Sequence, residues 1–116
     1  MGKYDYLMEE HKQQQIKKAG IEKKQLLIKI KEGIKGLAKN FEFKEVYIFG
    51  SVLETKTFYS YSDIDIGFYE LKNGDIFKVS AFLSRYLERN VDIIQMEGHR
   101  LEEKIKREGV VISWNE

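Results

Sequence analysis

The sequence predicts a single small α/β domain, with a mixed β-sheet and helices packed on it. Segments whose apolar residues recur at three- and four-residue steps, as on a helix, alternate with short runs rich in β-branched and aromatic residues. The chain has 116 residues, of which 42% are apolar. This length suffices for one well-buried core but not for two, and the apolar content is enough to fill it. Such an alternation in so short a chain predicts one sheet covered by helices.

The first part of the chain differs from the rest. Residues 1–20 are polar and have few apolar positions, so we expect a helical N-terminal extension that ends at Gly20. Residues 21–116 form the predicted domain. It opens with an amphipathic helix from Ile21 to Phe41, because apolar residues follow one another there at helical spacing. They are Leu26, Leu27, Ile30, Ile34, Leu37, Ala38 and Phe41.

The remaining elements follow in order along the chain. A β-rich run ends at Gly50 and predicts a buried strand, and a second β-rich run begins at Asp63. The turn signal Lys72-Asn73-Gly74-Asp75 then precedes a helix with an apolar stripe. The predicted strands cover residues 44–49, 63–69, 91–95 and 110–112, and the predicted helices cover residues 75–88 and 101–108.

The composition excludes several classes of protein. The 20 basic and 19 acidic residues nearly balance, which argues against a nucleic-acid partner, because proteins that coat nucleic acid carry a basic excess. There is no cysteine, so disulfides and thiolate metal sites are ruled out. No apolar run follows the lysine near the N-terminus as in a signal peptide, and no stretch approaches the roughly 18 apolar residues of a membrane span. We therefore expect a soluble cytoplasmic protein.

Asp63 and Asp65 form the first candidate site. On a strand they point to the same face, about 6.5–7 Å apart at the backbone, while Ile64 and Ile66 point into the core. Two such carboxylates repel each other unless a cation lies between them. Mg²⁺ suits them, because it prefers oxygen ligands and leaves positions for phosphates, and two ions can share such a pair. The alternative is a solvated strand face without a ligand.

Asp92 is the third candidate, since it lies in an otherwise apolar strand that looks interior, Val91-Asp92-Ile93-Ile94. A buried carboxylate must be paired, capped or bound to metal, because burying it bare is expensive. If this strand lies beside the second one, three carboxylates converge on one face. In the alternative, Asp92 lies at the exposed start of the strand and pairs with Arg89 or Lys78.

Gly50-Ser51 closes the first strand and precedes a predicted short helix. Ser51 and Glu54 match a capping box, which is a purely structural interpretation. The same geometry suits a phosphate, because a helix N-terminus offers free N–H groups and a positive dipole. Gly50 would let the phosphate approach the backbone, and Ser51 could donate its hydroxyl.

Taken together, Gly50-Ser51, Ser62-Asp63-Ile64-Asp65 and Asp92 resemble the minimal nucleotidyltransferases of the DNA polymerase β superfamily. The resemblance runs from about Ile21 to the C-terminus and includes Ile105–Val111, which looks like the usual ending of that family. It implies a polymerase β-like fold in which Gly50 and Ser51 bind the phosphates of ATP. It also implies that Asp63, Asp65 and Asp92 bind two Mg²⁺ ions, and that Asp92 can take the proton of the attacking hydroxyl.

The resemblance also implies a partner. Many such domains are antitoxins paired with HEPN-type ribonuclease toxins, and some transfer AMP to a tyrosine of the toxin. Residues 52–55 depart from the family, because they lack its usual arginine and second glycine. Two functions therefore stand side by side: an AMP-transferring antitoxin, or a catalytically weak or inactive antitoxin that neutralises its partner by binding alone.

Overall fold

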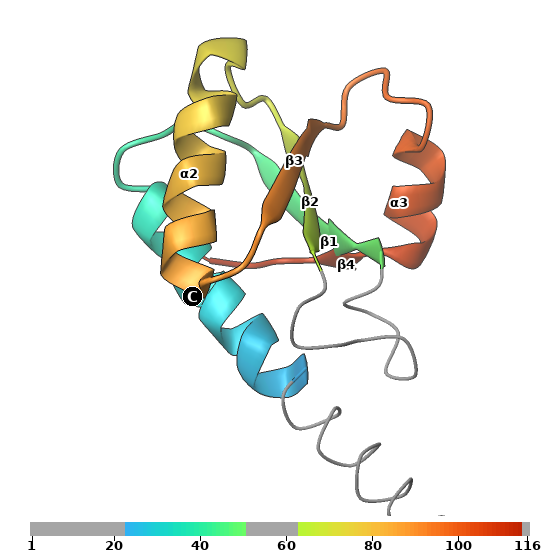
Figure 1. Ribbon diagram of the computed structural model, residues 1–116. Helices are drawn as coiled ribbons and strands as arrows, with labels where there is room; N and C mark the ends of the chain where they lie inside the picture. The colour runs from blue at the N-terminus through green and yellow to red at the C-terminus, as the bar shows by residue number, and fades with distance from the viewer. Residues whose placement is uncertain (1–22, 51–62, 115–116) are drawn as a thin grey trace, which may run out of the picture.

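The computed structural model describes residues 23–50 and 63–114, and it has the α/β class that the sequence predicts (Figure 1). The predicted N-terminal extension, Ser51 and the loop before Asp63 lie outside these residues. The first described element is a helix over residues 23–37. It is followed by β1 (Glu45–Phe49), β2 (Ile64–Tyr69), the 3-10 helix η2 (Asn73–Asp75), α2 (Ile76–Leu87), β3 (Val91–Gln95), α3 (Glu102–Glu108) and β4 (Val110–Val111).

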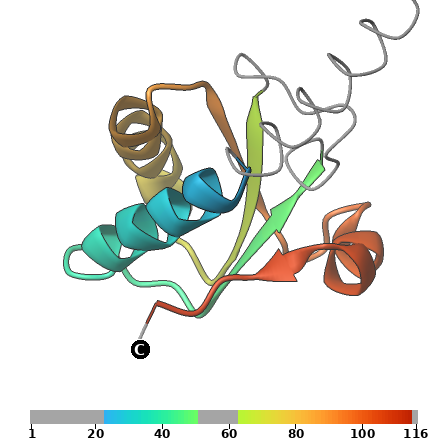
Figure 2. The same cartoon turned by 90° about the horizontal axis from the view of Figure 1, so that it is seen from below.

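The four strands form one mixed sheet in the order β3-β2-β1-β4. Strand β1 runs antiparallel to both of its neighbours, β2 and β4, whereas β2 and β3 are parallel. Helix 23–37 and α2 cover one face of the sheet, and α3 lies on the opposite face (Figure 2). The connection from β2 to β3 passes through α2, as parallel neighbours require a crossover.

Successive side chains of each strand point to opposite faces of the sheet, so the apolar side chains form two clusters, one on each face. Ile64 and Ile66 are buried beneath helix 23–37 and α2, as the sequence predicts, and Asp65 between them faces the other way. The main core also takes the apolar stripe of helix 23–37, namely Leu26, Ile30, Ile34 and Leu37. The second cluster lies beneath α3 and has Tyr47, Met96 and Ile105 at its centre. The sheet thus has a core face and a smaller, partly open face.

Several boundaries differ from the sequence prediction by one residue, and the end of the first helix differs by four. The first helix ends at residue 37, and a turn occupies residues 38–40. Its apolar pattern continues to Phe41 because the chain still packs on the core after the turn. The last strand includes only Val110 and Val111. None of the helices in residues 23–50 and 63–114 is both long and apolar enough to cross a membrane.

The prediction that Asp92 lies in an interior strand is wrong, because β3 is at an edge of the sheet and Asp92 is exposed. The strand is apolar for another reason. Val91 and Ile93 pack into the main core, and Ile94 packs into the second cluster on the opposite face. An edge strand with a layer on each side therefore has the composition of an interior one.

Two glycines of helix 23–37 give a matched test of this packing. A Cβ at Gly33 would lie 3.1 Å from side-chain atoms of Leu83 and Tyr86, whereas at Gly36 the nearest atom, in Phe82, is 3.7 Å away. We expect Gly36→Ala to raise the free energy of unfolding by about 0.5 kcal/mol through helix propensity. Gly33→Ala should raise the free energy of unfolding by less, or lower it, because side chains of α2 must move to make room for the Cβ. Urea denaturation measures both; equal gains would contradict the close helix contact.

Candidate functional site

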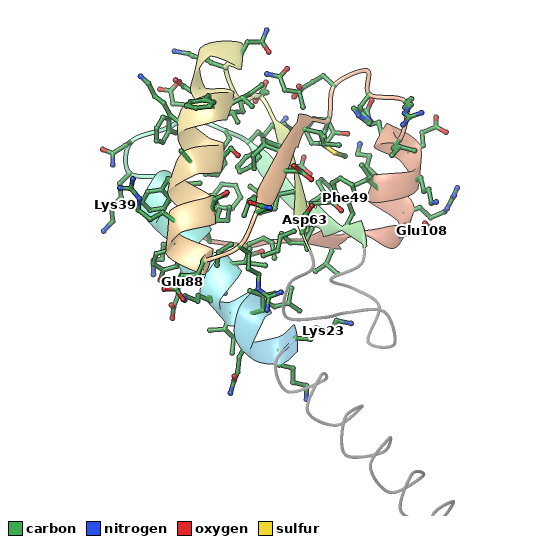
Figure 3. The ribbon with its side chains drawn as sticks, in the orientation of Figure 1. Lys23, Lys39, Phe49, Asp63, Glu88 and Glu108 are labelled. Carbon is green, nitrogen blue, oxygen red and sulfur yellow. The ribbon has the colours of Figure 1, made fainter. Side chains whose placement is uncertain are left out.

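Asp65 and Asp92 are brought together by the pairing of β2 with β3. These parallel strands place Asp65 directly beside Asp92, on the face of the sheet that α3 partly covers. Neighbouring strands are about 4.8 Å apart, so the two carboxylates are neighbours although they are far apart in sequence. Asp63 is exposed and lies one residue before β2, at the end of the strand where the chain enters the sheet (Figure 3).

The electrostatics of Asp65 reflect this arrangement. Its pKa is raised above the ordinary value of 3.8, first because the carboxyl is partly buried and then because of the negative charges of Asp92 and Asp63. Asp92 and Asp63 therefore both act electrostatically on Asp65. At neutral pH this part of the sheet disfavours the ionised form of Asp65, and a bound cation would relieve the repulsion.

The donor set fits Mg²⁺, although the described residues hold no group of three or more acidic or histidine side chains close enough to surround a metal ion. Mg²⁺ usually takes only one or two carboxylates from a protein and completes its shell with water and phosphate oxygens. Asp65 and Asp92 would supply such a pair of hard oxygen ligands, because they lie side by side on one face. The neighbouring charge of Asp63 adds to the attraction for a cation.

Gly50 follows β1 directly and lies against the side chain of Asp65. Its φ is +84°, in the left-handed region that favours glycine. A Cβ built at this position would collide with Oδ2 of Asp65. Phe49, the residue before it, is the register partner of Asp65 in the β1–β2 pair. Both the backbone conformation and the close approach of Asp65 therefore favour glycine here, whereas the position of Ser51 lies outside the described residues.

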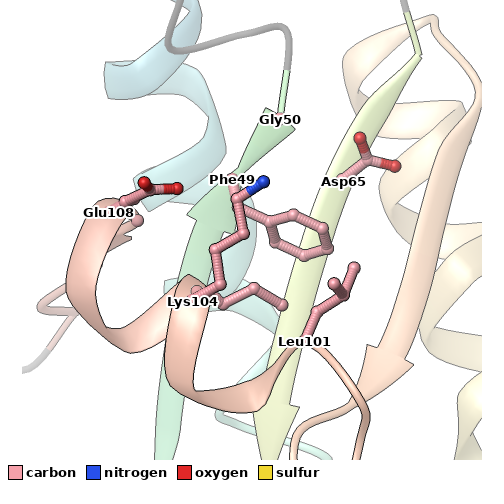
Figure 4. A pocket seen from close by; sticks show the side chains of 8 residues that line it. Phe49, Gly50, Asp65, Leu101, Lys104 and Glu108 are labelled. Atoms are coloured by element: carbon pink, nitrogen blue, oxygen red, sulfur yellow. The ribbon is translucent and has the colours of Figure 1, made fainter.

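A pocket of about 540 Å³ adjoins Asp65 and Gly50. Its lining comes from the ends of β1 and β2 on one side and from α3 and its flanks on the other (Figure 4). The side chain of Lys104 extends from α3 toward Gly50, while Glu108 lies one turn further along the helix. The lining residues are Phe49, Gly50, Asp65, Leu101, Lys104, Ile105, Glu108 and Gly109.

Sequence reasoning missed the contribution of α3 to this pocket. The four-residue spacing of Leu101 and Ile105 predicts the apolar side of the helix. Lys104 comes three residues after Leu101 and so lies next to that side. No sequence signal indicates that α3 lies on the opposite face of the sheet from the other two helices, next to Asp65. Lys104 and Glu108 therefore read as ordinary surface charges until the fold is known.

Known proteins resemble the chain over most of its length. The family described as "Polymerase beta, Nucleotidyltransferase" matches residues 29–116. A solved structure of a toxin-antitoxin with AMP-PNP is similar to the chain, with 25% identity, a TM-score of 0.59 and coverage of 75% of this chain and 72% of that one. A candidate nucleotidyltransferase from Sulfolobus solfataricus is 30% identical, with a TM-score of 0.51 and coverage of 80% and 84%. No curated protein matches the sequence.

Proposed function

Because this chain belongs to the polymerase beta nucleotidyltransferase family, we propose that it transfers AMP from ATP to a hydroxyl group of a partner protein. The observation that carries the proposal is the position of Asp65 beside Asp92 and against Gly50. The similar toxin-antitoxin structure with AMP-PNP supports a nucleotide substrate and a toxin as the partner. The resemblance of the motifs to antitoxins of HEPN-type toxins favours a tyrosine of such a toxin as the acceptor.

Mg²⁺ held by Asp65 and Asp92, with Asp63 beside them, would supply positive charge that offsets the charge of the phosphates. In the transfer, the hydroxyl oxygen of the acceptor forms a bond to the α-phosphorus of ATP. The bond from that phosphorus to the bridging oxygen breaks, and pyrophosphate leaves with the electron pair. The carboxylate of Asp92 takes the hydroxyl proton. The glycine at position 50 leaves room for phosphate oxygens close to the backbone.

The edge position of β3 suits an acceptor on a separate protein. Asp92 is exposed, and no further strand covers it on the outer side of β3 within the described sheet. A tyrosine of a bound partner could therefore approach Asp92 from outside the domain.

A second candidate function is neutralisation of the toxin by binding alone. Residues 52–55, Val-Leu-Glu-Thr, favour it, because they lack the arginine and glycine of the family and place an acidic side chain after Ser51. The aspartate pair and Gly50 oppose it, since a binding surface would need neither carboxylates side by side nor a glycine fitted against one of them.

Labelled ATP distinguishes the two candidates. With Mg²⁺ and the toxin partner, the protein should transfer label to the toxin at substoichiometric amounts, because each molecule turns over many times. Asp63→Ala should reduce labelling at least tenfold, since it removes a negative charge that would hold the metal. Asp75→Ala removes the same charge beside α2, where the side chain makes no capping hydrogen bond, and should leave labelling unchanged.

A different set of results would favour the binding function. Inhibition of the toxin only at one-to-one ratios or above, unchanged by Asp63→Ala and with no label transferred after long incubation, would refute the transferase and establish the binding function. Long incubation is needed because the departures at residues 52–55 predict a slow enzyme.

A further inference from the structure

The pocket beside Asp65 is poor in positive charge. Asp65 and Glu108 contribute carboxylates to its lining, and Lys104 is the one cation among the described residues that line it. A nucleoside triphosphate carries several negative charges, so a pocket that takes one must offset them. A bound metal ion would offset phosphate charge on the side of the aspartates. On the opposite wall of the pocket, Lys104 is the basic residue that can do so among the described lining residues.

Lys104 occupies that opposite wall. Its side chain reaches from α3 toward Gly50, the residue that contacts the carboxylate of Asp65 (Figure 4). The helix that carries it is anchored by Ile105, which is 3% exposed in the second cluster. The backbone N–H of Gly109 donates to the carbonyl of Ile105 at 2.7 Å and closes the helix beside the pocket. The lysine is thus an exposed cation on a helix that one buried side chain anchors to the sheet.

The other basic residues of α3 do not line this pocket. Nζ of Lys106 lies 5.2 Å from the centre of the Tyr69 ring, in a cation–π arrangement away from the aspartates. Arg107 is exposed and also absent from the lining. The apolar side chains of Phe49, Leu101 and Ile105 form part of the pocket wall, and a less polar wall strengthens any ion pair made there.

We propose that Lys104 binds the triphosphate of the nucleotide in this pocket, as a cation contributed by α3 and facing the aspartates. The inference rests on the proposed function, because it takes a nucleoside triphosphate as the ligand. It also accounts for how the site works without an arginine in residues 52–55: the missing positive charge comes from the far end of the chain. Glu108 opposes the phosphates and weakens their binding.

Calorimetry with AMP-PNP and Mg²⁺ tests the assignment on the full chain. Lys104→Gln should weaken binding about tenfold, as expected for loss of a charge-assisted contact made by an exposed side chain. Lys104→Arg should keep most of the affinity, and Glu108→Gln should increase it. Arg107→Gln is the matched control: it removes the same charge from the same helix outside the pocket, and its affinity should stay within about twofold of the wild type.

The results distinguish the role of Lys104 from the proposed function. Wild-type affinity in Lys104→Gln, or equal losses in Lys104→Gln and Arg107→Gln, would overturn the role of Lys104 and leave the proposed function intact. Failure of the wild-type protein to bind AMP-PNP with Mg²⁺ would overturn the proposed function and, with it, this inference. Circular dichroism of each variant shows that the comparison is made between folded proteins.

Discussion

Asp65→Asn is expected to abolish nucleotide transfer and to leave the domain at least as stable at neutral pH. The substitution removes a charged oxygen from the pair proposed to bind the metal, so the rate should fall at least about a hundredfold. The fold should tolerate it, because the ionised carboxyl is disfavoured by its own burial and by the charges of Asp92 and Asp63. An amide has nearly the same shape and carries no charge.

The stability gain should depend on pH in a defined direction. Because folding raises the pKa of Asp65, ionisation of this residue costs stability as the pH rises through that pKa. Asp65→Asn should therefore raise the melting temperature at pH 7, where roughly 4 °C corresponds to 1 kcal/mol in a domain of this size. The difference should shrink as the pH falls toward 3.8, the ordinary value for the group.

Thermal unfolding at several pH values measures this, with Asp75→Asn as the control for a distant aspartate. A large drop in the melting temperature of Asp65→Asn at pH 7 would mean that Asp65 is a structural hydrogen-bonding residue. Persistence of full transfer activity would refute its place in the proposed metal site.

Gly50→Ala is expected to damage both stability and activity. The left-handed φ of +84° costs a residue with a Cβ about 1–2 kcal/mol. The added Cβ also collides with the carboxylate of Asp65, so either β1 or Asp65 must move. We expect the free energy of unfolding to fall by about 2 kcal/mol and the transfer rate by at least about a hundredfold, because a displacement of 1 Å is enough to cost that much.

Gly98→Ala separates the two effects. Gly98 also has a positive φ, +71°, but a Cβ there would meet nothing within 4 Å. This variant should lose about 1 kcal/mol of stability and keep its transfer activity. Urea denaturation and the labelling assay measure both quantities. Equal activities for the two variants would show that the contact between Gly50 and Asp65 does not matter for the reaction.

Local rules in the sequence predict much of this arrangement. Alternation along β2 places Ile64 and Ile66 in the core and Asp65 on the opposite face, because each strand residue points away from its neighbour. The bounds of β3 also match, since Asn90 precedes a run rich in β-branched residues and Gln95 ends it. Such rules act within a few residues and need no knowledge of the fold.

Pairing between distant segments is harder to predict. The sequence makes the meeting of Asp65 and Asp92 conditional on β3 lying beside β2, and a slip of one residue would have turned Asp92 to the other face. The edge position of β3 and the side on which α3 packs depend on the whole sheet order. Lys104 and Glu108 belong to the pocket only because of that packing.

The unequal size of the two apolar clusters has a consequence for motion. Among the described residues, helix 23–37 and α2 share a core of fifteen buried residues, whereas α3 has seven residues and is held by a cluster with three buried members. Segments with little buried apolar surface open at the lowest free energy. The α3 wall of the pocket should therefore detach more readily than helix 23–37 or α2, while the aspartates remain on the sheet. The affinity for a ligand in the pocket would then include the free energy needed to keep α3 packed on the sheet. Changes to the packing of Ile105, which holds α3, would alter that affinity without changing the reacting groups.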